Sequence, residues 1–159
     1  MSTQQLIIAL FQRFCWLDEG LQARLHNRGW PDISRPQSMI MTNIVSNITR
    51  PSDIARNLGL SRQAIHNTIN QMVKMDIVRL TPDPDDRRHM ILSLTEAGAR
   101  MRHDAQQAMD ALTGQIAEKL GAEQLSALMQ MLEADWGDNM ENHSPADPSP
   151  AYQKAAARL

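Results

Sequence analysis

The sequence predicts a mainly α-helical fold with a small β-wing, and three observations support this prediction. Apolar residues recur at three- and four-residue spacing over most of the chain. A short helix, a tight turn and a second helix are indicated from residue 51 to residue 75. Two β-branched and aliphatic runs, joined by a segment rich in Pro and Asp, come next. We therefore expect a winged helix-turn-helix with long helices on both sides of it.

The helices at the two ends are long and amphipathic. Residues 4–27 repeat their apolar side chains over about six turns, and similar patterns run over residues 95–120 and 122–136. Such helices exceed what a small wing domain needs, so the two ends should pack on each other and on a second copy of the chain. A monomeric bundle that carries a wing is the alternative.

Two segments connect the first long helix to the helix-turn-helix. Residues 29–36 read as a loop because of their Gly and Pro content. A helix with an apolar face should follow over residues 35–47 and join the helix-turn-helix to the dimer core.

The helix-turn-helix begins with Pro51, which suits the first position of a helix. Ile54, Ala55 and Leu58 then share one apolar face. Gly59 can adopt positive φ where this helix must end, and the helix over residues 61–75 follows.

This second helix has an apolar and a polar face. The residues that should face the core are Ile65, Ile69, Met72 and Val73. On the polar face, Arg can bind guanine bidentately, Asn and Gln can pair with adenine, and His can donate or accept. The candidate DNA contacts here are Ser61, which can also cap the helix, Arg62, Gln63, His66, Asn67 and Asn70. A solvated amphipathic helix would show the same pattern.

The wing should consist of strands at residues 77–80 and 90–94 around an extended tip. Arg87 and Arg88 lie on the far side of this tip, where they could enter a minor groove or hold phosphates. Asp86 is close enough to brace one of them. Thr95, after the second strand, is a natural helix cap.

In these residues the chain resembles the MarR-type winged helix-turn-helix transcriptional regulators. The resemblance is carried by PSDIARNLGLSRQAIHNTINQMVKMDIVRL at residues 51–80 and by DPDDRRHMILSLTEAG at residues 83–98. The second motif is the more specific, because Asp-x-Arg at the wing tip, a strand and then Leu-Thr-x-x-Gly is a hallmark of the family. The likeness extends over residues 4–136.

The resemblance implies a homodimer that pairs through its terminal helices and presents two recognition helices to a pseudo-palindromic site on double-stranded DNA. It also implies that repression is the commoner outcome. In family members a cleft beside the helix-turn-helix can hold a small aromatic or phenolic effector that weakens DNA binding. Candidates for lining such a cleft are Trp16, His26, Trp30, Met39 and Met41. Core packing is the alternative role for each of them.

The expected organisation is one domain over residues 1–136, with dimerisation helices at 1–33 and 99–136 and the winged helix-turn-helix at 34–98. Residues 137–159 read as a Pro-rich linker and a C-terminal tail.

The distribution of charge supports a nucleic-acid partner, although the net charge of −2 does not. Residues 50–102 hold nine Lys or Arg and six Asp or Glu, a balance of +3, whereas residues 103–159 hold three and nine, a balance of −6. Positive charge is thus concentrated on the predicted DNA reader. The rival interpretation is a protein-interaction module, in which the wing domain binds another protein and the acidic end supplies contacts.

Cys15 is the only cysteine, which excludes an intramolecular disulfide and fits a reducing compartment. A redox switch would need a lowered thiol pKa and a partner, and the neighbouring Phe14 and Trp16 supply neither. We expect a packed, unreactive thiol.

Other classes of protein lack their signals. The chain has no signal-peptide pattern and no run of about 20 apolar residues, so a cytoplasmic location without a membrane partner is expected. Its five His residues show no metal-ligand spacing. A Gly-rich phosphate loop, a nucleophile elbow and paired carboxylates in an apolar setting are all missing, so we expect neither an enzyme nor a cofactor. A small-molecule carrier or enzyme would need a polar cluster in the cleft.

Overall fold

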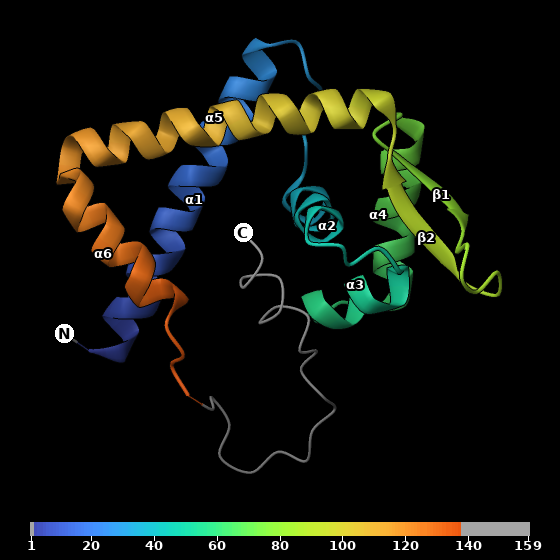
Figure 1. Ribbon diagram of the computed structural model, residues 1–159, viewed down its shortest axis with the longest axis horizontal. Coiled ribbons are helices and arrows are strands. Elements are labelled where there is room, and N and C mark those ends of the chain that lie inside the picture. The colour runs from blue at the N-terminus through green and yellow to red at the C-terminus, as the bar shows by residue number, and fades with distance from the viewer. Residues whose placement is uncertain (1, 138–159) are drawn as a thin grey trace.

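The computed structural model describes residues 2–137, which fold into six helices and a two-stranded antiparallel sheet. In chain order the elements are α1 (Thr3–Asn27), α2 (Arg35–Val45), α3 (Pro51–Leu58), α4 (Arg62–Lys74), β1 (Val78–Pro82), β2 (Met90–Leu94), α5 (Glu96–Leu120) and α6 (Ala122–Glu133). Figure 1 shows α5 running from the wing to the far end of the molecule, where α6 turns back. The predicted mainly α-helical fold with a small β-wing is confirmed. Residues 138–159 of the predicted tail lie outside the described residues.

The core of the winged helix-turn-helix is built from one apolar face of each element. Ile40 of α2, Ile54 of α3, Ile65 and Ile69 of α4 and Leu92 of β2 are fully buried together. Burying one such side chain stabilises the fold by about 1.5–3 kcal/mol relative to leaving it exposed. The sequence spacing of the apolar residues therefore determines which face of each helix points into the core.

The prediction that Val73 faces the core is wrong. Val73 is 43% exposed, whereas Met72 beside it is fully buried. The buried stripe of α4 passes through Ile65, Ile69 and Met72, and a step of one residue turns a side chain by about 100° around a helix. Val73 therefore lies at the edge of the stripe and faces solvent.

The turn between α3 and α4 forms as predicted. Gly59 ends α3 with φ at 63°, in the left-handed region. The Ser61 Oγ accepts the backbone N–H of Ala64 at 3.2 Å and so caps α4. Together these two residues end α3 and begin α4.

The wing is an antiparallel pair whose register runs from Val78 opposite Leu94 to Pro82 opposite Met90. Its first strand thus ends two residues later than predicted. The carbonyl of Thr49 accepts the N–H of Leu92 at 2.9 Å. This bond ties the segment before α3 to β2, so the wing is joined to the helix-turn-helix through backbone as well as side chains.

The start of α5 explains the Leu-Thr-x-x-Gly sequence. The Thr95 Oγ1 accepts the N–H of Gly98 at 2.9 Å and lies 3.2 Å from the Ile77 carbonyl oxygen, to which it can donate. A Cβ on residue 98 would stand only 1.9 Å from the same Ile77 oxygen. The threonine therefore caps α5 as predicted, and the glycine lets the first turn of α5 approach the residue before β1.

α1 crosses α5, and a small residue lies at the crossing. A Cβ on Gly20 would stand 2.8 Å from Leu112 Cδ2. At the end of α1, the Asp104 carboxylate of α5 accepts from Arg28 Nη1 at 2.9 Å and from Trp30 Nε1 at 2.6 Å. These contacts fix the loop after α1 on α5.

The N-terminal part of α1 and the whole of α6 expose a large apolar surface. On α1 the exposed side chains are Leu6, Ile7, Ile8, Leu10, Phe11 and Phe14. On α6 and just after it they are Leu128, Met129, Met131, Leu132 and Trp136. We call these residues the terminal-helix face.

Candidate nucleic-acid interface

The polar face of α4 is open to solvent. Its exposed side chains are Arg62, Gln63, His66, Asn67 and Asn70, the residues that the sequence nominated for DNA contact. The helix has 13 residues and is therefore about 20 Å long, which fits a major groove. Gln63 Nε2 donates to Asn67 Oδ1 at 3.0 Å, so the two amides hold each other on this face. Ser61 is exposed as well, but its hydroxyl serves as the helix cap.

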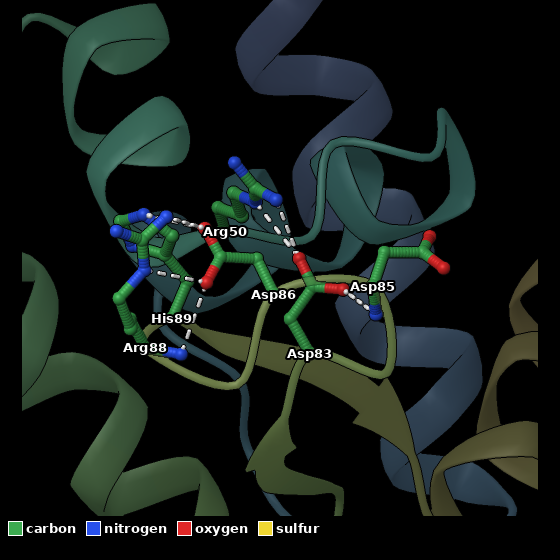
Figure 2. Close-up of polar contacts among 6 residues, drawn as sticks. All are labelled: Arg50, Asp83, Asp85, Asp86, Arg88 and His89. Carbon is green, nitrogen blue, oxygen red and sulfur yellow. Dashed lines mark hydrogen bonds and ion pairs between the residues drawn. The ribbon is translucent and has the colours of Figure 1, made fainter.

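The wing tip holds one arginine in a fork. Arg88 Nε donates to Asp86 Oδ1 at 2.9 Å, and Arg88 Nη2 donates to Oδ2 at 2.9 Å (Figure 2). The predicted brace is thereby confirmed. This contact with the Arg88 side chain, together with the Arg88 backbone N–H, lowers the pKa of the Asp86 carboxyl. The Arg88 side chain is 86% exposed and Arg87 is exposed beside it, so both can reach a phosphate or a groove.

A second ion pair holds the base of the tip, and it was not predicted. Arg50 Nη2 donates to Asp83 Oδ2 at 2.6 Å, and Arg50 Nε donates to the same oxygen at 3.1 Å. Asp83 is buried, with 6% of its surface exposed. The Arg50 guanidinium, followed by the backbone N–H of Asp85, lowers the pKa of the Asp83 carboxyl. The pair spans 33 residues, so only knowledge of the sheet register could have revealed it.

A cavity of about 370 Å³ lies between α1, α2 and α5. Its walls are mostly apolar and include Met39 and Met41, two of the predicted cleft residues. The polar side chains that reach it are Asp18, Ser38, Thr42, Arg102 and Gln106. This size lies at the lower end of the range for small-molecule sites.

The other three predicted cleft residues do not line this cavity. Trp16 is exposed on α1, and the exposed His26 places Nδ1 3.0 Å from Asp32 Oδ1. Trp30 packs against the core and donates to Asp104. The structure therefore brings together Met39 and Met41 but separates them from the two tryptophans and the histidine.

Known proteins resemble this part of the chain. Residues 32–89 match the model of the MarR family. The winged helix-turn-helix is thus similar to that of MarR-family proteins. The match covers α2, α3, α4 and the strand and tip that follow, which include both the polar face of α4 and the braced Arg88. No curated protein matches the chain.

Solved structures of MarR proteins share the fold of nearly the whole described chain. The reduced form of MarR from E. coli has a TM-score of 0.65 at 22% identity, and the match covers 84% of this chain and 95% of that one. A MarR-family regulator from Rhodococcus sp. RHA1 has a TM-score of 0.61 at 20% identity, with 84% and 94% covered. The repressor CouR, solved bound to a 23-mer DNA duplex, has a TM-score of 0.63 at 22% identity, with 78% and 87% covered. The last two of these proteins are a transcriptional regulator and a transcriptional repressor.

The thiol of Cys15 has a cationic neighbour that the sequence did not reveal. Arg35 Nη2 lies 3.7 Å from Cys15 Sγ, and the same guanidinium donates from Nε to Asp18 at 3.3 Å. Its carbon lies 5.2 Å from the centre of the Phe14 ring. The guanidinium comes from α2, one helix further along the chain, so adjacent residues gave no sign of it.

Residues 2–137 contain neither a metal-site cluster nor a helix suited to a membrane. Nowhere in this part of the chain do three His, Cys, Asp or Glu side chains gather as a metal site requires. No helix within the same residues has the length and apolar character that crossing a bilayer takes.

Proposed function

We propose that this protein is a MarR-type regulator, a cytoplasmic repressor that binds a pseudo-palindromic DNA site as a homodimer. Two neighbouring features carry the proposal. The polar face of α4 is exposed, and the wing that follows it in sequence has at its tip the exposed Arg88, which is oriented by the Asp86 carboxylate. An α-helix of this length fits the major groove, and an exposed arginine suits the minor groove. The duplex bound by CouR supports DNA as the partner.

Within this proposal the two elements have different tasks. Arg62, Gln63 and His66 lie on the first two turns of α4 and would read base edges together with Asn67 and Asn70. Arg88, oriented by Asp86 and helped by Arg87, would add contacts that depend little on sequence. Specificity would thus come from α4 and general affinity from the wing.

The terminal-helix face supports the homodimer. Residues 1–33 and 99–136 would supply the dimer contacts, leaving residues 34–98 as the DNA-binding part. An exposed apolar surface on two long helices is typical of an obligate interface rather than of a monomer. A twofold dimer would present two copies of α4 to half-sites about one turn of DNA apart.

The cavity is our candidate for the site of a small aromatic or phenolic effector. α2 lies between this cavity and the DNA-binding helices: Ser38 and Thr42 line the cavity, while the buried Gln37 places Nε2 3.5 Å from Gln71 Oε1 of α4. A second link joins Asn57 Nδ2 of α3 to Asn43 Oδ1 of α2 at 2.7 Å. A ligand that shifts α2 would therefore shift both helices of the reader, provided that it binds one arrangement more tightly than the other.

The experiment that tests the function is binding of the purified chain to its own upstream DNA and to a scrambled duplex, each at two salt concentrations. We expect much tighter binding to the native duplex and a steep loss of affinity with salt on both. Weak and equal binding to the two duplexes would reject sequence-specific recognition and favour the protein-interaction module. Release of the native duplex by a phenol or an aromatic carboxylate would test the effector separately.

A further inference from the structure

Arg50 lies at the junction between the helix-turn-helix and the wing, outside the side chains proposed to touch DNA. It is the N-cap residue of α3, and its guanidinium reaches across to the end of β1. There its Nη2 and Nε donate to one oxygen of the buried Asp83, Oδ2, at 2.6 and 3.1 Å. Two charge-assisted hydrogen bonds to one carboxylate restrict the guanidinium more than a single bond would.

Asp83 also bonds to the residues of the wing tip, so it connects Arg50 to the tip. Its other oxygen, Oδ1, accepts the backbone N–H of Asp85 at 3.0 Å, and its own N–H donates to the His89 carbonyl at 2.9 Å. The His89 N–H in turn donates to the Asp86 carbonyl at 2.9 Å, and the Asp86 carboxylate holds Arg88. Figure 2 shows this cluster as two neighbouring groups, Arg50 with Asp83 and Asp85, and Arg88 and His89 with Asp86. The two backbone hydrogen bonds of His89 join the groups.

We infer that Arg50 and Asp83 are positioning residues, which fix the wing tip on α3 so that Arg88 and α4 meet DNA together. The inference rests on the proposed DNA binding and adds two residues that do not contact DNA themselves. Without the pair, the tip at residues 83–89 would keep its own turn but lose its side-chain anchor to the helix-turn-helix. Arg88 would then be ordered only on binding, and the entropy lost at that moment would weaken the complex.

Asp83→Asn is a decisive test, because a positioning role and the change in charge alone predict opposite changes in affinity for duplex DNA. The change removes a negative charge from a loop next to the proposed DNA surface, which by charge alone strengthens binding to any duplex. Positioning predicts weaker binding, by about tenfold, because the Arg50 anchor is lost. Asp85→Asn is the matched control: it removes the same charge from the same loop. The Asp85 carboxylate points away from the cluster in Figure 2 and has no hydrogen-bond partner within residues 2–137.

The measurement is the dissociation constant of the full chain for the upstream duplex over a range of salt. Asp83→Asn and Arg50→Gln should weaken binding, whereas Asp85→Asn should leave it unchanged or tighter. Asp83→Asn should also flatten the salt dependence about as much as Arg88→Ala does, by about one phosphate contact. The double variant of Asp83→Asn and Arg88→Ala should bind no more weakly than Arg88→Ala alone, because both changes remove the same contact.

The outcomes separate the two proposals. If the wild type binds duplex DNA while Asp83→Asn binds as tightly as Asp85→Asn, the positioning role is rejected and the DNA-binding function stands. Fully additive losses in the double variant reject it as well. A wild-type chain that binds no duplex overturns the proposed function. Should Asp83→Asn fail to fold, Arg50→Gln carries the comparison, with Arg56→Gln as its control because Arg56 pairs only within α3, with Asp53, among the described residues.

Discussion

Single residues decide where the wing ends and α5 begins. Thr95 caps α5 through the N–H of Gly98, and Gly98 leaves room for the Ile77 carbonyl. The sequence identified both residues, Thr95 as a cap and Gly98 as part of a motif. It could not show why residue 98 is glycine, because the atom that excludes a side chain belongs to a residue 21 positions earlier.

We predict that Gly98→Ala destabilises the protein by about 1–3 kcal/mol, the usual range for an overpacked position. The new Cβ would stand 1.9 Å from a backbone oxygen, so the start of α5 would have to move away from β1. Urea unfolding monitored by circular dichroism measures the change. Gly114→Ala is the control, since Gly114 lies within the same helix with nothing within 4 Å of its added Cβ, and it should gain up to about 1 kcal/mol. Equal effects of the two changes would contradict the contact.

The ion pair between Arg50 and Asp83 should make the free energy of unfolding depend on pH in the acid range. Arg50 lowers the pKa of Asp83 in the folded state, below its ordinary value of about 3.9. A carboxyl with a lowered pKa contributes stability that is fully present above the ordinary value and is lost as pH falls through the folded one. The free-energy difference between wild type and Asp83→Asn should therefore be constant from pH 7 to about pH 5 and shrink below about pH 4. Urea unfolding of both proteins over this range measures it, and a difference that grows in acid would contradict the assignment.

At the scale of elements, the sequence predicted the order of helices and strands because each has a local signal. Periodicity places every helix, and Gly59 and Ser61 mark the turn between α3 and α4. The ends are less well defined: α2 stops at Val45 rather than residue 47, and α6 at Glu133 rather than residue 136. Contacts between distant segments, such as the Thr49 carbonyl on β2 or Arg50 on Asp83, have no local signal and were not predicted.

α4 and the wing should respond differently to mutation. Gln63→Ala or Asn67→Ala should cost about 1–3 kcal/mol of binding on the preferred site and little on a scrambled duplex. Because the two amides are hydrogen-bonded to each other, their losses should not be additive. Arg88→Ala should weaken both duplexes and lower the salt slope by about one. Fluorescence anisotropy on both duplexes at several salt concentrations measures all three variants, and unchanged affinity in Arg88→Ala would remove the wing from the mechanism.

At the scale of the whole molecule, the terminal-helix face should determine the oligomeric state. Ile7→Glu or Met131→Glu would place a charge on this face and should weaken the dimer by about 2 kcal/mol or more. Analytical ultracentrifugation measures the shift toward monomer. Val73→Gln, which changes an exposed apolar residue elsewhere, should leave the dimer intact. A wild type that is monomeric at all concentrations would instead favour the bundle with a wing.

The cavity belongs to the same scale, because it is formed by α1, α2 and α5 together. Ala105 lines it, and Ala105→Phe would fill it. A phenol or aromatic carboxylate that binds there should stabilise the wild type by about 2.7 kcal/mol at about 100 times its Kd and should not stabilise the variant. Thermal unfolding with and without ligand measures this. Ala111→Phe, on α5 but outside the lining, is the control, and equal stabilisation of all three proteins would exclude the cavity as the site.

α1 crosses α5 where Gly20 faces Leu112, so a larger residue at position 20 would tilt α1 about this point. α1 has 25 residues, so its N-terminal end lies about 25 Å from this point, and a tilt of about 5° there displaces that end by about 2 Å. In a dimer joined through this end of α1, the same tilt changes the separation of the two copies of α4. In such a dimer, a larger side chain at residue 20 would therefore change the distance between the two copies of α4, far from the residues proposed to touch DNA.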